Sequence, residues 1–180
     1  MARRSERTRR DLGRSAALTA WQRRALAVLK RHGVIEGLYL ARGVAVAHHV
    51  GHRTSNDLHL FAPSTDIDIE HVRRRATTLL AAEVVDQTEV TLKLKVGRAM
   101  VDLVCYPYPT LSRPRPGPEG VPVAGVRDLA AMKLAAVAKR GVRRDYWDLY
   151  ELLTRTRLTL LPYQVCPLLA GREPPPPRAR

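Results

Sequence analysis

The chain has 180 residues with a formal net charge of +14, and 45% of them are apolar. This length suits one domain with a sizeable core, alone or with a small helical appendage. It contains no run of about 18 apolar residues, so no membrane span is expected, and the basic N-terminus lacks the apolar stretch of a secretory signal. Cys105 and Cys166 show no metal-ligand spacing and are typical of reduced thiols in a cytoplasmic protein.

The excess of basic residues favours a polyanionic partner, with nucleic acid as the first choice. The alternative is a solvated basic surface in an arginine-rich composition. From composition and charge we expect a basic mobile arm over 1–13, a core over 14–110, a proline-rich linker or loop over 111–125, a helical C-terminal part over 126–170 and a disordered tail over 171–180.

Hydrophobic periodicity predicts the elements along the chain. Helices are expected over 15–32, 43–50, 69–82, 126–140 and 143–154, with another starting at Thr159. Strands are expected over 37–41, 57–61, 88–96 and 99–105. Gly97-Arg98 lies between the last two strands and is typical of a two-residue hairpin turn.

Three polar residues on predicted strands could share one face of the sheet. Asp57 and His59 are two positions apart, so they project to the same side of their strand. If the strand of Asp102 pairs beside them, its carboxylate joins them at one sheet edge. Clustered carboxylates hold the divalent ions used in phosphoryl transfer, although an Asp that starts a strand is more commonly a turn or cap residue.

Lys133 lies on an apolar face of the helix over 126–140, where a charge needs a partner or a ligand. Asp145 and Asp148 on the next helix can supply a structural ion pair, and the alternative is that Lys133 reaches a triphosphate. The junction between these helices holds four basic residues, which either are solvated or contact RNA phosphates. They are Lys139, Arg140, Arg143 and Arg144.

Three segments resemble the AbiEii/AbiGii toxin family, over roughly residues 35–155. Residues 38–61 match its strand, Gly-Gly-Thr, helix and Gly-His-Arg signature at Gly43, Gly51, His52, Arg53, Ser55 and Asp57. Residues 99–109 resemble its third-carboxylate strand, with Asp102 in place. Residues 128–153 match its Asp-Leu-x-x-Met-Lys helix, basic Arg-Gly turn and Arg-Asp-Tyr-x-Asp-Leu-Tyr helix.

The resemblance implies an α/β (α+β) fold of the minimal, polymerase-β-type nucleotidyltransferase class. That fold is a mixed sheet with flanking helices, followed by a helical C-terminal part. It also implies Mg²⁺ or Mn²⁺, a nucleoside triphosphate, transfer of a nucleotide to RNA, with tRNA expected, and a cognate antitoxin.

From the resemblance and the residue patterns together we expect three groups of site residues. The catalytic residues are Asp57, Asp102 and Lys133. The metal ligands are Asp57, His59 and Asp102. The nucleotide-binding residues are Arg42, Gly43, Arg53, Ser55, Lys133 and Asp148.

Three departures from the family pattern leave two functions open. Arg42 and Val44 replace the first Gly and the Thr of Gly-Gly-Thr, and His59 replaces the second Asp of Asp-Leu-Asp. Mg²⁺ prefers oxygen ligands to an imidazole, which Mn²⁺ tolerates better. One function is a nucleotidyltransferase, fully active or weakened. The other is a catalytically degenerate relative that binds nucleotide, RNA or a protein partner without turnover.

Overall fold

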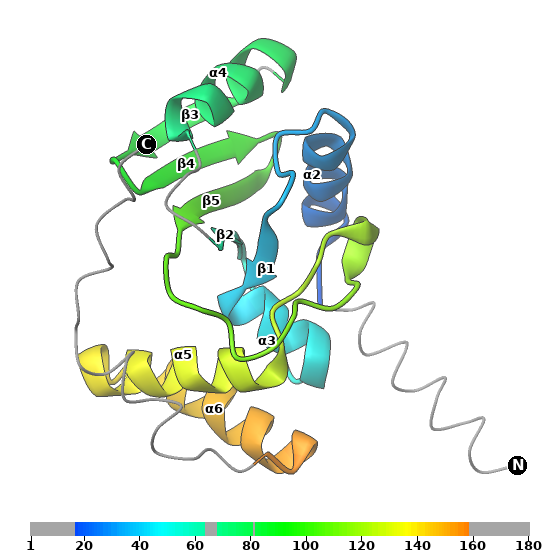
Figure 1. Cartoon of the computed structure of the whole chain (residues 1–180). Helices are drawn as coiled ribbons and strands as arrows, with labels where there is room; N and C mark the ends of the chain where they lie inside the picture. The colour runs from blue at the N-terminus through cyan, green and yellow to red at the C-terminus, as the bar shows by residue number, and fades with distance from the viewer. Residues whose placement is uncertain (1–16, 64–67, 81, 159–180) are drawn as a thin grey trace, which may run out of the picture.

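The computed structural model describes residues 17–63, 68–80 and 82–158, and Figure 1 shows the arrangement of their elements. The predicted arm, the helix from Thr159 and the tail lie outside these residues. The helices are α2 (Ala20–Arg31), α3 (Arg42–Val50), α4 (Ile69–Leu80), the short η1 (Pro118–Gly120), α5 (Val126–Arg140) and α6 (Arg143–Thr156). The strands are β1 (Tyr39–Ala41), β2 (Asp57–Ala62), β3 (Glu83–Gln87), β4 (Thr91–Val96) and β5 (Ala99–Cys105).

The five strands form one mixed sheet in the order β1-β2-β5-β4-β3. β2 and β5 pair in parallel at its centre, whereas the other neighbours are antiparallel. The hairpin between β4 and β5 turns at Gly97-Arg98, as predicted, because Val96 pairs with Ala99. This sheet and its helices confirm the predicted mixed α/β fold.

One face of the sheet is apolar and packs against helices. Leu58 and Leu60 of β2 and Val101 and Leu103 of β5 are buried in the core. α2 contacts β5, and α4 contacts β4 and β3, so these two helices cover that face. Since side chains alternate along a strand, the residues between them point to the opposite face, which is where the polar residues of β2 and β5 lie.

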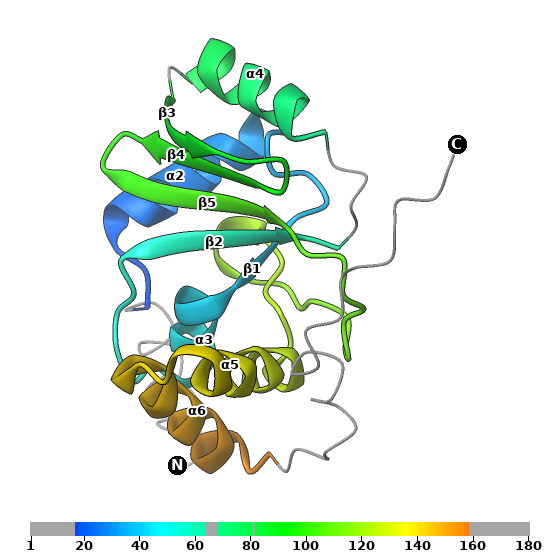
Figure 2. The same ribbon diagram turned by 90° about the vertical axis from the view of Figure 1, so that its left-hand side faces the viewer.

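A second group of helices lies near the β1 edge of the sheet. α3 contacts β1 and β2 as well as α5 and α6, which pack against each other. Figure 2 shows α5 and α6 beside α3, at the opposite end of the molecule from α4. None of the helices in the described part of the chain is long and apolar enough to cross a membrane.

Several predicted boundaries differ from the structure by a few residues, as at the start of β1 (Tyr39) and the end of α4 (Leu80), and two of the differences have clear local reasons. α2 begins at Ala20 rather than at residue 15, because the hydroxyl of Thr19 accepts from the Gln22 backbone while the Gln22 side chain accepts from the Thr19 backbone. β4 begins at Thr91 rather than at residue 88, because the Thr88 hydroxyl accepts from the Thr91 backbone in a turn. The edge strand β3 is missing from the sequence prediction.

The proline-rich stretch is held against the sheet near its end. The Leu40 backbone N–H donates to the Pro122 carbonyl at 2.7 Å, and the Ala124 N–H donates to the Leu40 carbonyl at 2.8 Å. Val121 and Val123 are buried. These contacts hold the end of the stretch against β1 and fix the start of α5 next to it.

Candidate active site

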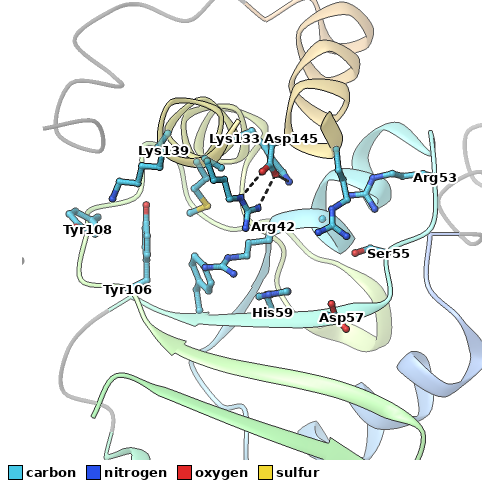
Figure 3. Close-up of a pocket in the computed structure, with 17 residues that line it drawn as sticks. Arg42, Arg53, Ser55, Asp57, His59, Tyr106, Tyr108, Lys133, Lys139 and Asp145 are labelled. Carbon is cyan, nitrogen blue, oxygen red and sulfur yellow. Dashed lines mark hydrogen bonds and ion pairs between the residues drawn. The ribbon is translucent and has the colours of Figure 1, made fainter. Parts of the chain in front are cut away.

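A cavity of about 490 Å³ lies between β2 and α5 (Figure 3). Its polar wall carries six basic side chains and two carboxylates. The basic residues are Arg42, Arg53, Lys133, Lys139, Arg140 and Arg144, and the acidic ones are Asp57 and Asp145. Such an excess of positive charge in a confined space favours an anionic ligand.

Asp57, His59 and Asp102 lie on one face of the sheet, as predicted. In the parallel pair of β2 and β5, His59 stands directly opposite Asp102, and Asp57 is two residues before it. The His59 Nε2 lies 3.2 Å from the Asp102 Oδ2. Asp57 and His59 line the cavity, whereas Asp102 borders it through His59.

The three predicted metal ligands do not fit a preformed Mg²⁺ site. Within the described residues, no group of three or more His, Cys, Asp and Glu side chains could hold a metal ion. Asp57 and Asp102 offer carboxylate oxygens, but His59 directs its Nε2 at Asp102, and Mg²⁺ prefers oxygen. Binding of Mg²⁺ or Mn²⁺ therefore stays a prediction.

Protonation of His59 should destabilise the fold in mild acid. Burial, and then the nearby charge of Arg42, lower the pKa of His59 to about 4 from its usual 6.5. Between these pH values the unfolded chain binds the proton more strongly, so stability falls as the pH falls. We expect urea unfolding to show this decline, and His59→Gln to reduce it. Parallel pH profiles for the two proteins would contradict this assignment.

Arg42 opens α3 in a backbone conformation that favours glycine. Its φ is 55°, in the left-handed region, which costs a residue with a side chain about 1–2 kcal/mol. The glycine of the family motif suits this geometry, and the chain keeps the geometry with an arginine in its place. The Arg42 guanidinium reaches into the cavity (Figure 3) and lies 5.5 Å from the centre of the Phe61 ring.

The charge of Arg42 is incompletely compensated. Burial, and then repulsion from Arg140, lower its pKa, whereas Asp102 acts in the opposite direction. An anion placed among these side chains would relieve that repulsion, which is what a polyphosphate can do.

Gly43 lets two predicted site residues approach the start of α3. A Cβ at this position would lie 2.7 Å from the Ser55 Oγ and 2.9 Å from the Arg53 Nη2. The Arg53 guanidinium cannot easily withdraw, because its Nε and Nη2 bind the Asp148 carboxylate at 2.6 and 2.7 Å. Gly43 thus sets the close packing of this wall of the cavity.

Gly43→Ala should therefore overpack the site. We expect a loss of about 1–3 kcal/mol in unfolding free energy, measured by denaturant titration. Ser55→Ala removes the nearest atom, so Gly43→Ala should cost less in a Ser55→Ala background. Equal costs in both backgrounds would show that the Ser55 hydroxyl is not the obstacle.

Lys133 is engaged by both aspartates that the sequence offered as partners. Its Nζ lies 2.8 Å from the Asp145 Oδ1 and 2.6 Å from the Asp148 Oδ2, and both carboxylates are fully buried. Arg140 also binds Asp145, at 2.7 Å. The ion-pair alternative therefore describes the lysine in this structure, although Lys133 still lines the cavity.

Asp148 holds three basic side chains together. Besides Arg53 and Lys133, the ring Nε2 of His52 lies 2.8 Å from its Oδ1. Asp148 is buried behind these residues and does not line the cavity. Its predicted contact with a nucleotide is untested, and the geometry favours a positioning role toward Arg53 and Lys133.

An aromatic wall lies at the end of the cavity, and its residues are absent from the predicted site. The Phe61 and Tyr106 rings stack at a centroid distance of 4.8 Å, and Tyr108 lies 5.0 Å beyond Tyr106. Figure 3 shows Tyr106 and Tyr108 beside Lys139, away from Asp57. Phe61 follows His59 by two residues on β2, so strand alternation could have placed it on this face.

A family profile and a known relative match this chain. The sequence profile of the family described as "Nucleotidyl transferase AbiEii toxin, Type IV TA system" matches residues 24–166. "Uncharacterized protein aq_aa25" of Aquifex aeolicus (strain VF5) is 32% identical over an alignment of 136 residues that covers 74% of this chain. The match spans 66% of that relative's length.

Two solved structures of the antibiotic-resistance factor ANT(2'')-Ia share the fold. The solution structure has a TM-score of 0.56 at 13% identity and covers 83% of this chain and 90% of that one. The crystal structure in complex with adenylyl-2''-tobramycin has a TM-score of 0.54 at 12% identity, with coverage of 83% and 95%. The family match extends over both the sheet and the two helices that close the cavity, and the chain belongs to the AbiEii nucleotidyl transferase toxin family.

Proposed function

We propose that the protein transfers a nucleotide from a nucleoside triphosphate to RNA, with tRNA as the expected acceptor, as the toxin of a toxin–antitoxin pair in the cytoplasm. The observation that carries the proposal is the cavity itself. It combines six basic side chains with a carboxylate, Asp57, on the central strand β2 of a nucleotidyltransferase-family chain.

The triphosphate is the ligand that suits the cationic part of the cavity. Arg42 and Lys139 are available to phosphate oxygens, while Arg53 and Lys133 are held in place by buried carboxylates. An arginine fork matches phosphate geometry well. The aromatic wall of Phe61, Tyr106 and Tyr108 offers apolar surface to the base.

Asp57 is the carboxylate best placed to act on the acceptor. Asp145, the other one in the cavity wall, already binds Lys133 and Arg140. In the proposed step the RNA hydroxyl attacks the α-phosphorus, a P–O bond forms to the RNA, and the bond to pyrophosphate breaks. The Asp57 carboxylate accepts the proton of the attacking hydroxyl. The basic side chains hold the charge of the departing pyrophosphate.

The second candidate is a degenerate relative that binds nucleotide, RNA or an antitoxin without turnover. His59 favours it, because it directs its ring at Asp102 and leaves the predicted metal ligands unassembled. The family nevertheless implies a divalent ion, so both Mg²⁺ and Mn²⁺ belong in every assay.

One incubation experiment distinguishes the two proposed functions. The protein is mixed with tRNA, each nucleoside triphosphate in turn and Mg²⁺ or Mn²⁺, and the RNA is resolved at single-nucleotide resolution. We expect extended tRNA with at least one triphosphate. Unchanged RNA under all conditions, together with saturable triphosphate binding, would favour the degenerate relative.

A further inference from the structure

The outer face of α6 carries three exposed aromatic rings. Tyr146 is 52% exposed, Trp147 49% and Tyr150 60%. The Trp147 and Tyr150 rings are tilted by 32° with centroids 6.1 Å apart. We call these three residues the aromatic platform. The inner face of the same helix buries Asp145 and Asp148, which pair with Lys133 of α5, and the platform lies outside that contact.

The platform lines a second hollow, of about 840 Å³, whose charged residues are all arginines. They are Arg53, Arg143 and Arg144, and Val142 completes the wall. Exposed aromatic surface grouped in one patch commonly marks a binding site. Aromatic rings bordered by cations are what single-stranded nucleic acids use, since bases stack on the rings and phosphates meet the charges.

The second hollow adjoins the active-site cavity. Arg53 and Arg144 line both. A ligand lying on the platform can therefore continue past these arginines toward Asp57. An RNA acceptor must do this, because its reactive hydroxyl has to enter the cavity while the rest of the strand stays outside.

We propose that the aromatic platform binds the unpaired nucleotides next to the acceptor end of the RNA, by stacking their bases on Trp147 and its neighbouring tyrosines. The inference rests on the proposed function and names the form of its acceptor. Bases within a duplex are already stacked on each other, so the platform selects a single-stranded end. Stacking is tolerant of sequence, so the platform guides the strand without reading it.

Trp147 can report directly on this contact. The chain has two tryptophans, Trp21 and Trp147, so Trp21→Phe leaves Trp147 as the sole one. We expect single-stranded oligoadenylate to quench Trp147 fluorescence and to shield it from acrylamide. An RNA duplex of equal length should do neither. Unchanged fluorescence at oligoadenylate concentrations that saturate the protein would overturn the proposal.

Binding of a labelled oligoadenylate separates stacking from charge. Trp147→Ala should weaken binding about tenfold, in line with the loss of one base stack, without changing the dependence on salt. Trp147→Phe should recover most of the affinity. Arg143→Gln should instead reduce the slope of log K against log salt by about one phosphate contact.

Trp21→Ala is the matched control. Trp21 is 43% exposed on α2, has arginines over its ring, and lines neither hollow. It should leave oligoadenylate affinity unchanged. Equal effects of Trp21→Ala and Trp147→Ala, or no effect of either, would overturn the proposal. Oligoadenylate binding that Trp147→Ala does not change would also overturn the proposal. If the same variant then changed the sedimentation of the protein alone, this face would be assigned to contact with a second copy.

These outcomes are distinct from failure of the proposed function. If the protein binds oligoadenylate through Trp147 but extends no RNA, the proposed role of the platform stands and the proposed transferase activity fails. If Trp147→Ala extends tRNA as well as the wild type does at RNA concentrations below saturation, the transferase activity stands and the proposed role of the platform fails.

Discussion

Asp148→Asn should destabilise the protein by about 3–5 kcal/mol, the largest effect on stability that we expect from a single substitution. Asp148 is fully buried and binds His52, Arg53 and Lys133. The amide keeps the shape of the side chain but removes its charge, so the buried Lys133 loses half of its compensation. Denaturant unfolding monitored by circular dichroism measures the loss.

The dependence of the unfolding free energy on pH at low pH should change in the same variant. Burial alone would raise the pKa of Asp148, but hydrogen bonds from Arg53, His52 and Lys133 outweigh it and hold the pKa well below its usual range. The stability that Asp148 contributes is present above the pKa of an unfolded aspartate, about 3.9, and is lost as the pH falls toward the lowered folded value. Asp148→Asn should flatten stability against pH in that range.

Asp86→Asn is the control for the loss of a carboxylate. Asp86 is exposed on the edge strand β3 and pairs with Lys93 at 3.3 Å. Exposed pairs contribute about 0–1 kcal/mol, so this variant should unfold nearly as the wild type does. Similar losses for Asp86→Asn and Asp148→Asn would mean that the buried network does not stabilise the fold.

Asp57→Asn should reduce nucleotide transfer by about 10²–10⁴-fold, the largest effect on activity that we expect. Asp57 is exposed and lines the cavity, so the amide should leave the unfolding free energy and triphosphate binding close to those of the wild type. The rate of RNA extension at saturating triphosphate is the measurement. A variant that is folded, binds triphosphate and extends RNA at the wild-type rate would remove Asp57 from the mechanism.

His59→Asp is the complementary substitution at the same strand. It restores the second carboxylate of the family motif, so we expect tighter Mg²⁺ binding and faster transfer in Mg²⁺, whereas the wild type should prefer Mn²⁺. Metal-dependent melting shifts measure binding separately from activity. If His59 is only a structural strand residue, the new carboxylate repels Asp57 and Asp102, and the variant loses stability without gaining metal binding.

The residue pattern predicted which site residues share a face of the sheet and which pair between α5 and α6. It could not show how the sheet and these helices come together. The spacing of Asp57 and His59 predicted a shared face, and the positions of Lys133, Asp145 and Asp148 predicted contact between α5 and α6. The parallel pairing of β2 with β5 depends on contacts between segments about 40 residues apart, which local periodicity does not encode.

Other features depend on tertiary packing. β3 escaped prediction because all five of its residues are exposed, so its sequence lacks the apolar alternation of a half-buried strand. The role of Asp148 as an anchor for Arg53 required the fold, since the two residues come from different halves of the chain. The positive φ of Arg42 could be inferred from the family glycine, whereas the contact of its guanidinium with the Phe61 ring could not.

The most direct test of the proposed transfer is to follow the two ends of the triphosphate separately. The protein is incubated with tRNA and a nucleoside triphosphate labelled at either the α- or the γ-phosphate, with Asp57→Asn in parallel. Nucleotidyl transfer predicts that the α-label enters the RNA, the γ-label leaves in pyrophosphate, and the variant does neither. Entry of the γ-label into RNA would contradict nucleotidyl transfer, and incorporation that is equal in the wild type and Asp57→Asn would contradict the role of Asp57.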